Sequence, residues 1–259
     1  MVTVKSIIYI FLPIALVLII LIKKDSFELK SSFWINQKWQ CYDILLVVIC
    51  FSTFQVAALT MGEYKLVKFY HLYIFGNIFC IAALGVILFG LIYLKYKANY
   101  SSLGLSSERF FSNVAIGLTM FLIYALFILV ISFLLNREYL LYNRAELFIK
   151  MKLNQLPLLD SLVYVLGIVA IAPFVEECVF RGLMFSPFAR KIGEPGSICL
   201  TSIMWSITHF QTKSLISLFL IGIFLCYLYK RFKSLIPGII MHSMLNLSNL
   251  VIYTFWIMK

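Results

Sequence analysis

Two adjacent glutamates and an arginine lie inside an apolar stretch of the sequence, where charged side chains are costly. Glu176, Glu177 and Arg181 occur within the run from Leu162 to Phe188, which is long enough to cross a bilayer. A charged side chain at the middle of a membrane helix costs about 2.5–3.5 kcal/mol on insertion scales. We therefore expect these three residues to face a protein interior or a wet cavity, where such residues usually form a functional site.

Helical spacing divides the two glutamates between different roles. Glu177 and Arg181 lie one helical turn apart and can pair directly. Glu176 points about 100° away from Glu177 on a helix, so it is less committed to Arg181. One carboxylate is thus neutralised within its own helix, and Glu176 remains available to groups from other helices.

Further polar residues occur in the apolar segments that follow. His209 lies near the end of the segment 197–210, and His242 lies in the middle of the segment 235–258. Asn246 follows His242 by one helical turn, so these two side chains share a helix face. The first four apolar segments hold no comparable pair of ionisable residues.

One carboxylate and two imidazoles on three helices allow two kinds of hydrolysis. In the first, Glu176 takes a proton from a water that His209 helps to hold, while His242 and Asn246 donate hydrogen bonds to the oxyanion. No cofactor is then needed. In the second, Glu176, His209 and His242 bind a Zn²⁺ ion that activates the water. The residues alone leave both mechanisms open.

Two other interpretations compete with a hydrolase. Glu177 and Arg181 could form only a packing salt bridge within a buried polar network. Proton-coupled transporters also carry Glu, Arg and His in their cores, where these residues relay protons.

Composition indicates an all-α polytopic membrane protein. The 259-residue chain is 63% hydrophobic and only 13% charged, whereas a soluble domain is about a quarter charged. The net charge of +11 comes from basic residues between apolar segments, which favours contact with the lipid bilayer over nucleic acid. We expect one transmembrane domain, residues 1–259, built as a bundle of about eight helices at 7–22, 44–59, 73–94, 114–135, 162–188, 197–210, 215–229 and 235–258.

Three local features modify this expected bundle. Residues 136–158 alternate charged and apolar side chains, which suits a helix lying on the membrane or a solvated loop helix. Pro173 should kink the fifth span just before Glu176. The breaker residues of 190–196 should end that span.

Three motifs in order resemble the CPBP family, which includes the type II CAAX prenyl endopeptidases and the related bacterial bacteriocin-processing and immunity (Abi) proteins. The EExxxR motif is matched by Glu176, Glu177 and Arg181. The FxxxH motif reads Trp205 to His209, with Trp in place of Phe, and the HxxxN motif is matched by His242 and Asn246. The resemblance covers about residues 160–250, which would contain the catalytic helices.

The resemblance implies an intramembrane endopeptidase that cleaves a membrane-associated peptide, protein or prenylated substrate. It assigns water activation to Glu176, assistance to His209, oxyanion stabilisation to His242 and Asn246, and supporting roles to Glu177 and Arg181. The Trp205 departure keeps an aromatic side chain. Family members also serve in bacteriocin self-immunity, so a non-proteolytic binding or immunity protein that retains the site is an alternative. We expect a multi-pass protein of a bacterial cell membrane.

Overall fold

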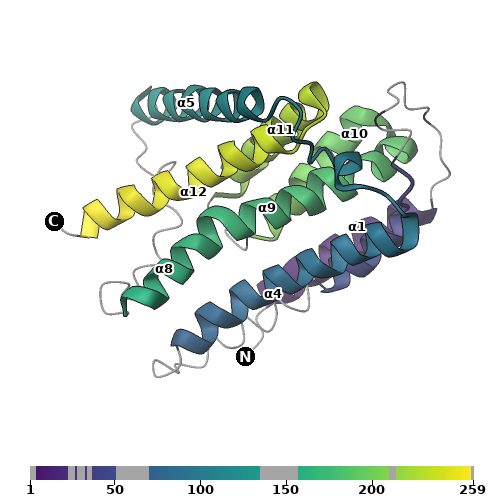
Figure 1. Cartoon of the computed structure of the whole chain (residues 1–259), viewed down its shortest axis with the longest axis horizontal. Coiled ribbons are helices and arrows are strands. Elements are labelled where there is room, and N and C mark those ends of the chain that lie inside the picture. Colours follow the sequence, from purple (N-terminus) through teal and green to yellow (C-terminus); the bar gives the residue numbers. More distant parts are fainter. Residues whose placement is uncertain are drawn as a thin grey trace.

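The computed structural model describes residues 4–22, 27, 33, 37–50, 70–134, 157–209 and 214–257, and this part of the chain contains helices but no strand. This confirms the all-α fold class. The helices in Figure 1 are α1 (Val4–Ile22), α4 (Tyr70–Gly90), α5 (Phe110–Leu134), α8 (Leu158–Leu166), α9 (Ala172–Glu177), α10 (Phe185–Ile207), α11 (Leu215–Phe232) and α12 (Ile236–Ile257). A further helix covers 41–50, while residues 51–59 of the expected second span and 136–156 of the amphipathic stretch lie outside the described residues.

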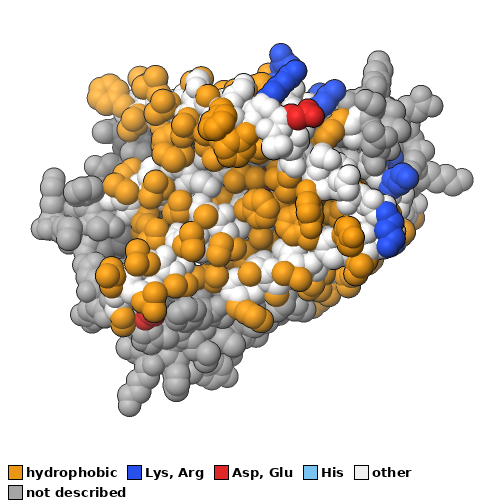
Figure 2. Space-filling model, viewed as in Figure 1, with side chains coloured by type: hydrophobic (Ala, Val, Ile, Leu, Met, Phe, Trp, Pro, Cys, Tyr) orange, Lys and Arg blue, Asp and Glu red, His pale blue; other side chains and the backbone are white. Residues whose placement is uncertain are grey.

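Apolar surface covers the helices, as expected of a protein in lipid. Phe110–Ile131, Leu158–Leu183 and Leu215–Phe232 are each long and apolar enough to cross a membrane. On the face shown in Figure 2, hydrophobic side chains cover the middle, and Lys and Arg side chains gather toward one end. The protein is therefore an all-α membrane protein.

The helix that carries the two glutamates contains two widened turns. A π-helical segment, Gly167–Ile171, separates α8 from α9, and a second one, Cys178–Leu183, follows Glu177. Pro173 lacks an N–H, and its ring crowds the carbonyl group four residues earlier. The expected distortion is thus present, but it takes the form of a widened turn ahead of Pro173, and helical structure continues through it.

The breaker residues of 190–196 interrupt the helix, as expected. One turn residue, Met184, separates the second π-helical segment from α10, and α10 leaves helical geometry at Gly193. Gly193 has a φ of 77°, a left-handed conformation that glycine adopts without steric cost. The breaker residues therefore form a corner, after which the second limb of α10 runs back toward the site and ends beside His209.

Two glycines allow close packing of α5 against α12 and of α11 against α10. A Cβ atom on Gly117 of α5 would lie 2.7 Å from both the Ile240 side chain and the Pro237 carbonyl oxygen of α12. A Cβ atom on Gly222 of α11 would lie 3.0 Å from the Ser202 Cα of α10. Small residues allow this close approach where no hydrophobic driving force holds helices together.

We expect Gly117→Ala to lower the thermal stability of the purified protein, because the added methyl group meets backbone atoms of α12 that cannot easily move. Overpacking of this kind costs about 1–3 kcal/mol. Gly90→Ala is the matched control, since a Cβ atom there meets nothing within 4 Å. Equal melting temperatures for the two variants in the same detergent would contradict the tight contact between α5 and α12.

Candidate active site

The structure brings together the three residues that were expected to hold a water or a metal. Glu176 comes from α9, His209 lies just beyond the end of α10, and His242 comes from the first half of α12. One ligand atom from each residue lies within 4.8 Å of the other two. Glu176 Oε2 is 3.9 Å from His209 Nε2 and 3.9 Å from His242 Nε2.

A buried network fixes the neighbouring carboxylate of Glu177. Its Oε1 atom accepts hydrogen bonds from Arg181 Nη1 at 2.9 Å and from His242 Nδ1 at 3.1 Å. Glu177, Arg181 and His242 are 1%, 0% and 2% exposed. Arg181 Nη2 also donates to the Gly222 carbonyl oxygen at 3.3 Å. Helical spacing predicted the pair with Arg181, but the contact between Glu177 and His242 joins two helices and was missed.

Both imidazole rings are oriented by acceptors on their Nδ1 atoms. His242 Nδ1 faces the Glu177 carboxylate, and His209 Nδ1 lies 2.8 Å from the Trp205 carbonyl oxygen. Because a carboxylate and a carbonyl can only accept, each Nδ1 must carry a hydrogen. Each Nε2 atom is thereby turned toward Glu176. In the described part of the chain, His242 Nε2 is buried and makes no hydrogen bond.

Trp205 contacts the Glu176 carboxylate directly, a role that sequence reasoning missed. Its indole Nε1 donates to Glu176 Oε2 at 2.7 Å. The ring also packs edge-on against His209 and His242, with centroids 4.5 and 5.3 Å apart, and the Arg181 guanidinium lies 5.0 Å from its centroid. The Trp-for-Phe replacement was the available signal, because phenylalanine has no N–H to donate.

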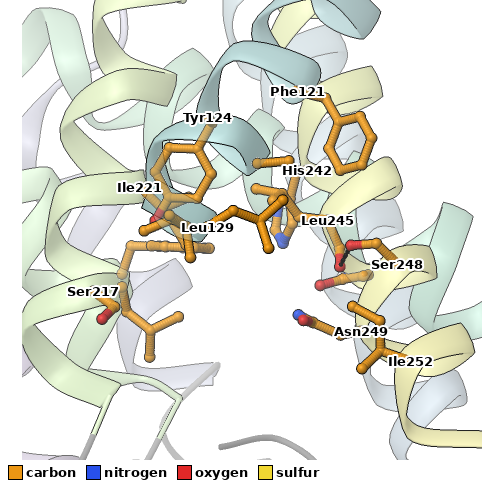
Figure 3. Close-up of a pocket in the computed structure, with 15 residues that line it drawn as sticks. Phe121, Tyr124, Leu129, Ser217, Ile221, His242, Leu245, Ser248, Asn249 and Ile252 are labelled. Atoms are coloured by element: carbon orange, nitrogen blue, oxygen red, sulfur yellow. Dashed lines mark hydrogen bonds between the residues drawn. The ribbon is translucent and has the colours of Figure 1, made fainter. Parts of the chain in front are cut away.

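Asn246 lies one turn beyond His242 on α12, as its spacing predicted. Its Nδ2 atom donates to the Ile168 carbonyl oxygen at 2.9 Å, within the π-helical segment ahead of Pro173. A side-chain amide has two N–H donors, so this bond uses one of them. Asn246, His242 and Trp205 also line one cavity between α5, α11 and α12 (Figure 3).

The donor set of Glu176, His209 and His242 fits a Zn²⁺ ion. One carboxylate and two imidazoles are the three protein ligands of several catalytic zinc sites. Metal-binding histidines usually donate their other ring N–H to a carboxylate or a backbone carbonyl, as both histidines do here. The buried His242 Nε2 without a hydrogen bond adds to this fit.

We expect Arg181→Met to destabilise the protein strongly, because it leaves the buried Glu177 carboxylate without its cation. Breaking a buried ion pair from one side costs about 3–5 kcal/mol. The double variant Glu177→Gln/Arg181→Met should recover part of this loss, since no unpaired charge remains. A double variant no more stable than Arg181→Met in thermal unfolding would show that the pair contributes through packing alone.

One comparison with known proteins matches the segment of the chain that contains this site. Residues 158–248, about a third of the chain, match the family model "Type II CAAX prenyl endopeptidase Rce1-like". No curated protein and no solved structure matches the chain. The matched segment contains all three motifs and every residue of the site described above. The resemblance inferred from the motifs is thus confirmed, and residues 158–248 carry the signature of the Rce1-like type II CAAX prenyl endopeptidases.

Proposed function

We propose that this protein is an intramembrane endopeptidase in which Glu176 activates a water molecule. The observation that carries the proposal is the convergence of Glu176 Oε2 and two imidazole Nε2 atoms on one small space inside the helix bundle. Gaps of 3.9 Å are too long for direct hydrogen bonds but suit one water that contacts both neighbours. The family match adds a protease class and a peptide substrate at the membrane.

The proposed reaction uses Glu176 first as a base and then as an acid. Its carboxylate removes a proton from the water while His209 holds the water in place. The hydroxide oxygen forms a bond with the carbonyl carbon, and the carbonyl π electrons move to its oxygen. When the tetrahedral intermediate collapses, the C–N bond breaks and the Glu176 carboxyl returns its proton to the leaving nitrogen. Proton transfer by a positioned side chain contributes about 10²–10⁴-fold to the rate.

Charge balance supports an oxyanion role for His242. Glu176 and Glu177 carry two negative charges against the single positive charge of Arg181, which leaves one excess negative charge in a largely buried cluster. A proton on His242 Nε2 neutralises the cluster and turns this atom into a donor that faces the reacting carbonyl. Asn246 supplies a second donor from the same helix face.

A Zn²⁺ ion is the second way to supply the missing positive charge. Glu176, His209 and His242 would hold it, and it would make a bound water more acidic. Zinc binding is favoured by the convergence of one Glu176 oxygen and the two imidazole Nε2 atoms. Each imidazole is also oriented by a hydrogen bond from its Nδ1 atom.

Removal of the Glu176 carboxylate tests the proposed base. The wild-type protein and Glu176→Gln would both be placed in lipid nanodiscs and incubated with a library of membrane-associated peptides, and cleavage products would be measured by mass spectrometry. We expect the wild-type protein to cleave some of these peptides, and Glu176→Gln to cleave them at least 100-fold more slowly. The amide keeps the size of the side chain but cannot take the proton. Full cleavage activity of Glu176→Gln would exclude Glu176 as the base, whereas no cleavage by the wild type would favour a binding, self-immunity or transport function.

Treatment with a chelator distinguishes a mechanism that uses a proton on His242 from one that uses a bound Zn²⁺ ion. We expect cleavage to persist after treatment with a strong zinc chelator, and the purified protein to carry less than one tenth of an equivalent of zinc by elemental mass spectrometry. Cleavage that chelation abolishes and Zn²⁺ restores, together with one equivalent of bound zinc, would make Glu176, His209 and His242 metal ligands.

Trp205→Phe should lower the cleavage rate by about 10- to 100-fold, because it removes one hydrogen bond to a carboxylate, worth about 1.5–3 kcal/mol. The aromatic ring remains, so the melting temperature should change little. Ile203→Phe is a control on the same helix, at an exposed side chain. An unchanged cleavage rate in Trp205→Phe would show that the indole N–H does not position Glu176.

We propose that the enzyme works in a bacterial cell membrane.

A further inference from the structure

A cavity of about 170 Å³ lies between α5, α11 and α12. In Figure 3, the labelled side chains from these three helices surround one space, with the His242 ring beside it. Its wall is mostly apolar, and Tyr124, Ile128 and Leu218 are buried there, each less than a tenth exposed. Leu129 and Ile252 are about half exposed, so the cavity combines a buried floor with an accessible rim.

The volume limits what the cavity can hold. An engineered apolar protein cavity of about 150 Å³ binds benzene, a molecule of six carbon atoms. A cavity of about 170 Å³ therefore suits one phenylalanine, leucine or methionine side chain. A chain of about fifteen carbons has more than twice the heavy atoms of benzene and would extend beyond these walls.

The cavity lies next to the proposed catalytic residues, so a side chain bound in it would lie close to the reacting carbonyl group. His242 and Asn246, the proposed oxyanion donors, form part of the wall. Trp205, whose indole N–H donates to the Glu176 carboxylate, also lines the cavity. A carbonyl group that accepts hydrogen bonds from His242 and Asn246 would therefore lie at the edge of this space. The side chain next to that carbonyl group is the part of a peptide that can enter it.

We propose that this cavity is a specificity subsite for one large apolar side chain of the peptide substrate, located beside the scissile bond. This inference rests on the proposed endopeptidase function. It sets a size limit: a leucine or phenylalanine fits, whereas a long prenyl or acyl chain does not. Burial of that side chain supplies apolar binding energy and places the neighbouring carbonyl group against His242 and Asn246.

Peptides that differ at one position test the size limit. Wild-type protein in nanodiscs would receive a panel with Ala, Leu, Phe or S-farnesyl-cysteine at that position. We expect cleavage of the Leu and Phe peptides at least tenfold faster than of the Ala and farnesyl peptides. Ala125→Phe, which fills the cavity, should reduce cleavage of the Leu and Phe peptides at least tenfold and leave the Ala peptide within about threefold. Ala115→Phe is the matched control, at an exposed position of the same helix.

Two outcomes of this panel would overturn the subsite. Fastest cleavage of the farnesyl peptide would identify a prenyl chain as the occupant. Equal effects of Ala125→Phe on all peptides, or of Ala115→Phe and Ala125→Phe on the Leu peptide, would show that the cavity does not select a side chain.

Photocrosslinking gives a readout that does not depend on cleavage. The Leu peptide would carry photo-leucine, which has nearly the size of leucine, and would be irradiated with Glu176→Gln. We expect crosslinks at the rim residues Leu129 and Ile252, and their loss when Ala125→Phe is added. Crosslinks that avoid the cavity, or no crosslinks, would overturn the subsite. Crosslinks in the cavity without any cleavage by the wild type would instead overturn only the proposed endopeptidase function.

Discussion

The rest of the site depends on the hydrogen bonds that hold the buried carboxylate of Glu177. It accepts hydrogen bonds from Arg181 on its own helix segment and from His242 on α12, and all three side chains are almost fully buried. Such a carboxylate is tolerated among apolar helices only while both partners stay in place. The requirement extends to the backbone of α12, because a Cβ atom on Gly238 would lie 3.2 Å from Glu177 Oε2.

This network couples the stability of the bundle to the orientation of the site. The hydrogen bond from His242 Nδ1 to Glu177 directs His242 Nε2 toward Glu176. Trp205 acts on the other side of the same space, where its indole N–H contacts Glu176 and its carbonyl oxygen orients His209. Each group expected to contact the water is thus positioned by a second residue, as precise catalytic geometry requires.

Hydropathy predicted most of the helices, and helical spacing predicted the contacts within one helix. The pair of Glu177 and Arg181 needed only the rule that residues one turn apart are neighbours. The same rule placed Asn246 beside His242, and the three motifs predicted that Glu176, His209 and His242 would meet.

The hydrogen bonds from Trp205 to Glu176 and from His242 to Glu177 escaped prediction, because they depend on how each helix is rotated and where it bends. The hydrogen bond from Trp205 to Glu176 requires the limb of α10 that follows Gly193, and the corner at Gly193 sets the direction of that limb. The widened turns around Pro173 alter the helical register locally, and hydropathy does not report such changes. The cavity was also missed, since α5 contributes apolar side chains that resemble any lipid-facing residue in the sequence.

The proposed active site is tested most directly by a cryo-electron-microscopy structure of the wild-type protein bound to a phosphinic peptide, which mimics the tetrahedral intermediate. Transition-state analogues occupy the reacting position more tightly than substrates do. We predict one phosphinyl oxygen between Glu176 and His209, in the place of the attacking water, and the other within hydrogen-bond distance of His242 Nε2 and Asn246 Nδ2. A phosphinyl group bound away from these residues, or a Glu176 carboxylate turned out of the shared space, would contradict the proposed active site.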